Sequence, residues 1–156
     1  MNNPKHYVID MFDCCKQPLK STCDVENYLR SVVRYLGLVA MSYCHLHKFL
    51  PDGHPDNDGI TASLILTTSL ISIHTYPRER ACYIDLFACT DYSQDDFLEF
   101  SKSWFKGKTA LMRPVPRMKY TRQFSEDYKD RRKNFNYHFG IESDSDPEVN
   151  NYGLMY

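Results

Sequence analysis

Apolar residues recur at helical spacing in two stretches of the chain. Before the first stretch, Ser21 can cap a helix, with Asp24 at the third helical position, and Gly37 can end it. One face of this helix then carries Val25, Tyr28, Leu29, Val32 and Leu36. The pattern predicts an amphipathic helix from about residue 22 to residue 36.

The second helical stretch follows the same pattern. Ser93 stands at the cap position, Asp96 three residues later, and Gly107 at the expected end. Its apolar stripe consists of Phe97, Phe100 and Trp104. A second helix is therefore predicted within residues 93–107.

Between and around the helices lie runs of β-branched and aromatic residues, which favour strands. "CCKQPLK" reads as a turn, and the Pro and Gly residues of 50–59 indicate a loop. The predicted strands are HYVIDMFD (6–13), LVAMSYCHLHKF (38–49), ITASLILTT (60–68), SLISIHTY (69–76), ACYIDLFAC (81–89) and TALMR (109–113). Together these elements predict an α+β fold, a two-layer sandwich of a mainly antiparallel sheet with two helices on one face. Apolar residues on both faces of the strands favour a partner on the other face.

A change of composition near residue 117 divides the chain. Residues 117–133 carry seven Lys or Arg and three Asp or Glu with aromatic residues between them, and residues 142–148 are acidic. We therefore predict a domain at residues 1–116 and a C-terminal extension at residues 117–156. A solvated amphipathic extension is a commoner use of such a segment than RNA or protein binding.

Composition and charge narrow the classes of function. The formal net charge of −1 gives no general attraction to nucleic acid or to an anionic membrane. No apolar run reaches 18 residues and the first residues lack the apolar core of a signal peptide, so we expect neither a membrane span nor secretion. The six cysteines show no CxxC spacing and are predicted to be thiols of a cytoplasmic protein.

Three histidines could suggest a metal site. His45 and His47 would share one side of a strand, and His54 lies in the following loop. No HExxH motif or Cys pair accompanies them. We therefore expect no metal.

The stretch TTSLISIHTYPRERACYIDLFAC (67–89) holds Ser69, His74 and Cys89 in two predicted strands. Taken singly, such residues are more often structural: a hydrogen-bonded Ser, a satisfied His and a small buried Cys. Taken jointly, they resemble a known pattern. This stretch, with HLHKFLP before it and KHYVIDMFDC at the N-terminus, is similar to the bacterial and archaeal S-adenosylmethionine decarboxylases, whose pattern is GxS, ESHxxIHTxPE and DxFxC. The resemblance spans roughly residues 5 to 115.

Members of that family cut their own backbone and turn the reactive Ser into an N-terminal pyruvoyl group. This ketone condenses with the substrate amine as a Schiff base and accepts the electrons released on decarboxylation, so pyridoxal phosphate is unnecessary. The resemblance implies that Ser69 becomes the pyruvoyl group after a cut between Thr68 and Ser69. It also implies that His74 acts as the base in the cleavage, that Thr61 assists through its hydroxyl, and that Cys89 protonates the substrate carbon as a general acid.

The resemblance further implies a binding site for the substrate. Phe49 and Tyr76 match the two aromatic residues that sandwich the adenine, and such faces also favour a sulfonium cation. The implied activity is decarboxylation of S-adenosylmethionine for spermidine synthesis. A homodimer with packed sheets and with active sites near the interface is also implied.

Three residues depart from the family pattern. Thr68 replaces a Glu before the cut, Leu70 replaces a His after the reactive Ser, and Arg78 replaces the Glu that would accept hydrogen bonds from both ribose hydroxyls. At ~6–8 Å from a sulfonium, with an effective dielectric constant of ~20, the Arg78 charge costs on the order of 2 kcal/mol. Glu79 could replace the missing carboxylate if the turn shifts by one residue.

These departures keep two alternatives open. The chain could be a pyruvoyl-dependent decarboxylase of another amino acid, such as ornithine or arginine. It could also be an unprocessed, catalytically inactive relative that acts by binding.

Overall fold

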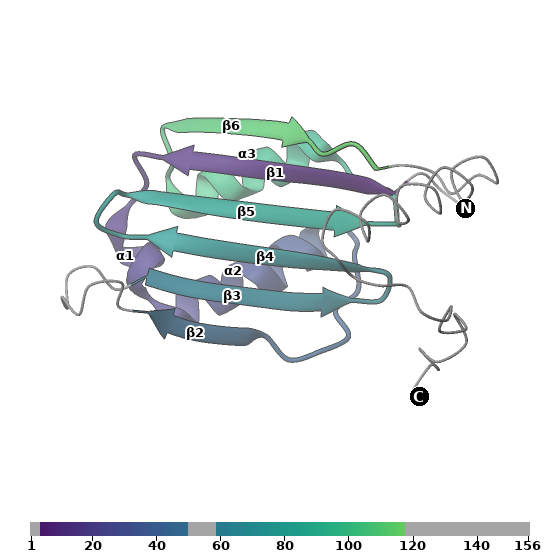
Figure 1. The fold of residues 1–156 in the computed structure, drawn as a ribbon, viewed down its shortest axis with the longest axis horizontal. Coiled ribbons are helices and arrows are strands. Elements are labelled where there is room, and N and C mark those ends of the chain that lie inside the picture. The colour runs from purple at the N-terminus through teal and green to yellow at the C-terminus, as the bar shows by residue number, and fades with distance from the viewer. Residues whose placement is uncertain (1–3, 50–58, 118–156) are drawn as a thin grey trace, which may run out of the picture. The chain divides into compact units, whose positions relative to one another are not determined.

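A computed structural model of the chain describes residues 4–49 and 59–117 (Figure 1). Contacts between residues divide the chain into two units, Met1–Arg117 and Met118–Tyr156. The fold described below is that of the first unit, so most of the predicted C-terminal extension lies outside the described residues. None of the described helices is long and apolar enough to cross a membrane.

Six strands form one sheet in which every neighbouring pair is antiparallel. They are β1 (Lys5–Phe12), β2 (His45–Phe49), β3 (Gly59–Leu66), β4 (Ser69–Tyr76), β5 (Ala81–Ala88) and β6 (Thr109–Pro114). Their order across the sheet is β2-β3-β4-β5-β1-β6. Short turns join β3 to β4 and β4 to β5, which is possible only between antiparallel strands.

Three helices cover one face of the sheet: α1 (Lys16–Lys20), α2 (Thr22–Tyr35) and α3 (Gln94–Phe105) (Figure 1). The two-layer α+β prediction is confirmed. The predicted turn at CCKQPLK contains the short helix α1. The strand expected at 38–49 extends only over β2, because residues before it make a single isolated bridge, from Ala40 to Leu66.

The sequence signals at the helix ends are present in the structure. Ser21 and Ser93 accept hydrogen bonds from the backbone N–H of Asp24 and Asp96, at 3.1 and 3.2 Å. These bonds satisfy donors that a helix start leaves free. Gly37 has φ 71°, as expected of a glycine after a helix.

The end and the buried face of α3 differ in detail from the prediction. The left-handed residue after the helix is Lys106 rather than Gly107. Gly107 is needed for another reason, since a Cβ there would overlap the Met11 side chain. The fully buried positions are Phe97, Ser101 and Phe105, whereas Phe100 and Trp104 are only partly buried at the core boundary.

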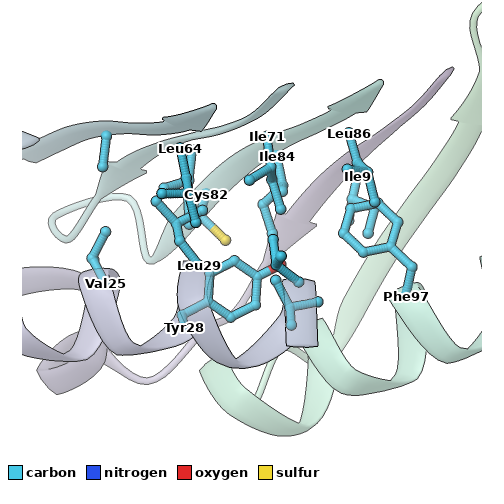
Figure 2. Close-up of a cluster of buried hydrophobic side chains, with 14 of the residues drawn as sticks. Ile9, Val25, Tyr28, Leu29, Leu64, Ile71, Cys82, Ile84, Leu86 and Phe97 are labelled. Carbon is cyan, nitrogen blue, oxygen red and sulfur yellow. The ribbon is translucent and has the colours of Figure 1, made fainter. Parts of the chain in front are cut away.

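The core lies between the sheet and the helices (Figure 2). Alternate residues of β3, β4 and β5 point into it, while the buried faces of α2 and α3 close it from the other side. At its centre the Tyr28 hydroxyl lies 2.7 Å from the Ser101 hydroxyl, which donates to the Phe97 carbonyl at 2.7 Å. Tyr28 is thus a fully buried phenol whose polar atom has a partner, and its burial raises its pKa.

Candidate active site

The first group of candidate residues lies at the hairpin between β3 and β4. Thr68 is in the turn, and Ser69 is the first residue of β4. The Ser69 hydroxyl accepts a hydrogen bond from the backbone N–H of Cys89 at 3.2 Å, and it lies 3.2 Å from the Thr68 hydroxyl. The structure therefore brings together Thr68, Ser69 and Cys89, which we call the cleavage end of the sheet.

A shallow pocket of about 170 Å³ adjoins the cleavage end. It is lined by Gly37, Leu38, Val39, Leu66, Thr67, Thr68, Ser69 and Thr90. Alternation along β4 puts Ser69 on the helix side with Ile71 and Ile73, which are buried. Cys89 is exposed and, by the same alternation along β5, continues the series of Asp85 and Phe87 on the opposite side.

That opposite side, which no described helix covers, is called the open face. Its apolar side chains are unusually exposed for a sheet: Phe12, Ile65, Leu70, Tyr83 and Leu111 have exposed fractions between 37% and 54%. Two polar pairs lie among them, Arg113 with Asp10 at 2.6 Å and His6 with Asp85 at 3.6 Å. The Nδ1 atom of His6 is buried and has no hydrogen-bond partner among the described residues.

A second group of candidates lies on the open face toward the other end of β4. Thr61 and His74 are direct partners in the β3–β4 register, and the Thr61 hydroxyl is 3.1 Å from Nδ1 of His74. Phe49 and Tyr76 lie one step further along, with ring centroids 5.8 Å apart. These four residues and the turn at 77–80 form what we call the turn end of the sheet.

The rings of Phe49 and Tyr76 belong to a longer aromatic row. Tyr76 contacts Tyr83 at 5.6 Å, and Tyr83 contacts Phe12 at 6.2 Å, with interplanar angles of 78° and 85°. Phe49 meets Tyr76 at 69°, edge to face. Two rings that sandwich a flat base must be parallel and about 7 Å apart, twice the stacking distance of ~3.5 Å. The pair is therefore closed as it stands, and binding an adenine requires one ring to rotate.

The turn at residues 77–80 carries the departures from the family pattern. Arg78 and Glu79 are exposed and have no hydrogen-bond or ion-pair partner among the described residues. Arg80, by contrast, donates from Nε to the Cys14 carbonyl at 2.9 Å and from Nη2 to the Asp13 carbonyl at 3.3 Å. Arg78 and Glu79, the charged residues expected to face a substrate, are thus without a partner among the described residues, whereas the Arg80 side chain is hydrogen-bonded to the backbone.

The structure does not bring the two ends together within one chain. Ser69 and His74 are five residues apart on the same strand, a separation of about 16 Å at ~3.3 Å per residue. An odd separation also directs their side chains to opposite faces. In Figure 1 the β3–β4 and β4–β5 turns lie at opposite ends of strand β4. His74 of one chain therefore cannot reach Ser69 of the same chain in this arrangement.

The remaining titratable groups belong to the scaffold. All six cysteines are free thiols, as the sequence indicated. Cys14 and Cys82 are buried side by side, and a hydrogen bond from Cys82 lowers the pKa of the Cys14 thiol against the opposing effect of burial. His45 and His47 are exposed on the edge strand β2, and His54 lies outside the described residues. The part of the chain that the structure describes holds no cluster of His, Cys, Asp or Glu suited to a metal.

Comparison with known proteins agrees with this arrangement. Residues 5–118 match the S-adenosylmethionine decarboxylase family. The chain belongs to this family. Relatives named S-adenosylmethionine decarboxylase proenzyme include that of Methanococcus aeolicus, 32% identical over 88 residues, which are 56% of this chain and 69% of the relative. That of Methanococcus maripaludis strain S2 is 29% identical over 110 residues, 69% of this chain and 84% of the relative.

A relative of the same name from Clostridium botulinum strain Hall is 34% identical over 87 residues, 54% of this chain and 67% of the relative. Among solved structures, the adenosylmethionine decarboxylase of Aquifex aeolicus aligns with a TM-score of 0.65 and 21% identity. This alignment covers 78% of the present chain and 95% of the Aquifex chain. This match confirms the fold, a sheet with a helix layer on one face.

Two features of the site are absent from the sequence-based list. Tyr83 extends the aromatic row, and its alternation with Asp85 and Phe87 in ACYIDLFAC could have shown it, since all three occupy one side of a strand. The engagement of Arg80 had no such signal. It depends on the proximity of the β1 end, which is 67 residues away in sequence.

Proposed function

We propose that the chain is the proenzyme of a pyruvoyl-dependent S-adenosylmethionine decarboxylase that supplies the aminopropyl donor for spermidine synthesis. The observation that carries the proposal is the Ser69 hydroxyl beside Thr68 in a tight hairpin, held by the Cys89 N–H, within a segment that matches the family. The relatives named above share one description, which favours this activity over the ornithine, arginine and binding-only alternatives.

The residues at the cleavage end fit the formation of a pyruvoyl group. Ser69 supplies all of its carbon atoms, and its hydroxyl needs only to add to the adjacent Thr68 carbonyl carbon. The amide C–N bond is exchanged for an ester, and removal of the Ser69 α-proton then expels the Thr68 carboxylate. The remaining enamine takes a proton and becomes an imine. Water adds to its C=N carbon, ammonia leaves, and the ketone results. When formed, this group supplies the electron sink for decarboxylation.

The other residues would handle protons at this ketone. The Thr61 hydroxyl lies 3.1 Å from Nδ1 of His74 and would orient the ring, so that Nε2 would be the atom that takes a proton during the cleavage. The backbone N–H of Cys89 contacts the Ser69 hydroxyl, and the exposed Cys89 thiol on the open side of the same residue would return a proton to the substrate carbon. Phe49 and Tyr76 would hold the adenine once the closed pair opens.

A homodimer would reconcile the separation of the two ends. If the open faces of two copies packed with antiparallel strands, the cleavage end of each chain would meet the turn end of the other. Burial of the exposed apolar residues of the open face supports this assembly. The proposed compartment is the cytoplasm, where free thiols such as those of this chain persist.

The mass of the intact purified protein tests the proposal. Cleavage between Thr68 and Ser69 gives fragments of residues 1–68 and 69–156, which are 68 and 88 residues long. The larger fragment should begin with a pyruvoyl group, and the cleaved protein should release carbon dioxide from S-adenosylmethionine. A single full-length mass, or a cleaved protein without this activity, would refute the proposed function.

A further inference from the structure

The Pro-containing turn at residues 77–80 is tied to a distant corner of the chain. Arg80 closes the turn by donating its N–H to the Pro77 carbonyl at 3.3 Å. Its carbonyl accepts the Cys14 N–H at 2.9 Å, and its Nε donates to the Cys14 carbonyl at 2.9 Å. Nη2 adds a bond to the Asp13 carbonyl at 3.3 Å. We call this set of bonds the Arg80 clasp.

The clasp requires unusual backbone conformations on both sides. Arg80 has φ 53° and Asp13 has φ 57°, both in the left-handed region that residues other than glycine rarely adopt. Such a conformation persists only where the surrounding contacts compensate for its cost. Here the compensation comes from the forked guanidinium, because its fixed geometry lets one side chain satisfy two successive carbonyls.

The segments that the clasp joins are those that carry the turn end. The turn holds Arg78 and Glu79, and the corner follows directly after Phe12, the last ring of the aromatic row. Tyr76 and Ala81 pair on either side of the turn. A one-residue shift of the turn, which would exchange Glu79 for Arg78, must therefore break the clasp and move Arg80 out of its left-handed position.

We propose that Arg80 is a positioning residue that fixes the register of the 77–80 turn, so that residue 78 and not residue 79 is the charged residue that determines substrate specificity at this site. This inference rests on the proposed function, because it concerns the same substrate. It assigns to Arg80 an action through the turn, with no contact to the reacting atoms.

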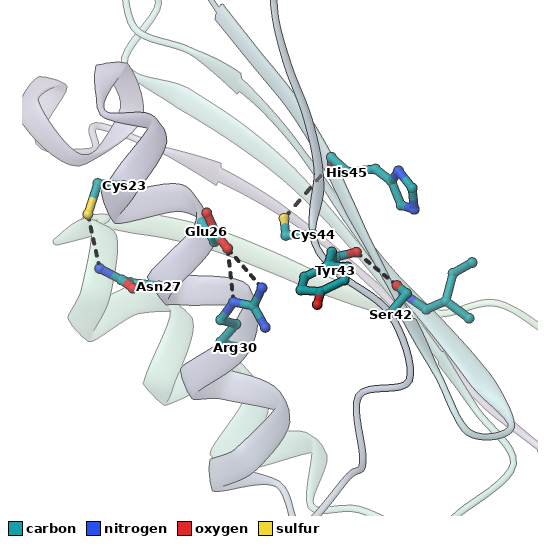
Figure 3. A network of polar contacts seen from close by, with 9 residues as sticks. Cys23, Glu26, Asn27, Arg30, Ser42, Tyr43, Cys44 and His45 are labelled. Carbon is teal, nitrogen blue, oxygen red and sulfur yellow. Dashed lines mark hydrogen bonds and ion pairs between the residues drawn. The ribbon is translucent and has the colours of Figure 1, made fainter.

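The test compares Arg80→Gln and Arg80→Gly with Arg30→Gln. Arg80→Gly removes the side-chain bonds but allows the left-handed backbone, so it separates the clasp from backbone strain. Arg30 is a matched control, since it also makes two side-chain bonds, to Glu26 at 2.9 and 3.0 Å, on the surface of α2 (Figure 3). Loss of the clasp frees the turn to shift, so that Glu79 can take the place of the repulsive Arg78. We therefore expect both Arg80 variants to lower KM for S-adenosylmethionine several-fold with kcat changed less than about twofold, and Arg30→Gln to change neither.

Amide hydrogen exchange provides a readout that does not depend on activity. In the full-length, uncleavable Ser69→Ala protein, loss of the clasp should speed exchange at the backbone N–H groups of Cys14 and Arg80, and Arg30→Gln should not. Unchanged exchange rates at the N–H groups of Cys14 and Arg80 in both Arg80 variants would show that the Arg80 side chain does not stabilise the turn. A wild-type KM in Arg80→Gly would overturn its positioning role. Inactive wild-type protein would refute the proposed function and leave the clasp to be judged by the exchange data.

Discussion

In the proposed function, the two ends of strand β4 carry different halves of the chemistry, and they are held in different ways. At the cleavage end, Lys5 donates to the Tyr92 carbonyl at 3.0 Å and pairs with the exposed Asp91. The Ser69 hairpin near these bonds joins two central strands, and its turn residues Thr67 and Thr68 are exposed. At the turn end, buried Thr75 and the Arg80 clasp fix the backbone from both sides.

This difference suits the two tasks. The proposed self-cleavage requires the Ser69 hydroxyl to move toward the Thr68 carbonyl, and the exposed position of Thr68 leaves room for this movement although the Thr67 N–H anchors the hairpin to the Val39 carbonyl at 3.0 Å. Substrate binding requires fixed aromatic and charged groups, because each ordered side chain reduces the entropy lost on binding. The separation of about 16 Å along one strand keeps the two ends from meeting within one chain.

The strongest test of the separation mixes two inactive variants. Cys89→Ala damages only the cleavage end, and Phe49→Ala damages only the turn end. If each site combines ends from two chains, subunit exchange should restore about a quarter of the wild-type activity, since half of the dimers hold one intact site of two. The measurement is carbon dioxide release after co-refolding. Activity no greater than the sum of the two separate variants would show that one chain forms the whole site.

The charge at the turn end gives the next largest expected effect. Arg78→Glu removes a repulsion on the order of 2 kcal/mol from a sulfonium and adds a bidentate acceptor, so KM for S-adenosylmethionine should fall roughly tenfold or more. Arg34→Glu, exposed in the last turn of α2 on the helix side of the sheet, makes the same charge change as a control. An unchanged KM in Arg78→Glu would contradict the assignment of residue 78 to the substrate site.

The packing of the turn end can be tested at Gly59. A Cβ at this position would overlap the Phe49 ring and the Thr75 carbonyl, so Gly59→Ala should lower the free energy of unfolding by about 1–3 kcal/mol. It should also weaken substrate binding by displacing Phe49. Gly37→Ala, where an added Cβ meets nothing within 4 Å, should cost only about 1 kcal/mol from its φ of 71°. Urea denaturation measures both, and equal costs would argue against the clash.

The smallest effect is expected from the ion pair at the cleavage end. The hydrogen bond and the charge of Lys5 lower the pKa of Asp91 below its ordinary value of 3.8. The folded state therefore favours the carboxylate, so the contribution of the pair is present above that value and is lost as the pH falls through the lower, folded-state pKa. Asp91→Asn should thus reduce the urea midpoint slightly near pH ~7 and not at all near pH ~2. A difference that persists in acid would assign the effect to something other than charge.

Much of the fold was predictable from local chemistry. The caps at Ser21 and Ser93, the strand-forming runs and the short turns between them dictate helices and antiparallel hairpins without long-range information. The exact buried stripe of α3 was not predictable, because Phe100 and Ser101 fit the helical period equally well. Packing against Tyr28 selects Ser101, since the phenol needs a hydrogen-bond partner in the core.

By itself, the sequence determined the family, the strand that carries Ser69 and His74, and the three altered positions, because motif spacing is preserved in the order of residues. Only the tertiary structure decided that Ser69 meets Cys89, that Thr61 meets His74, and that the two pairs lie far apart. It alone revealed the Arg80 clasp. Contacts between residues distant in sequence depend on the register between strands and on where each strand ends. Neither can be predicted from one segment of the sequence alone.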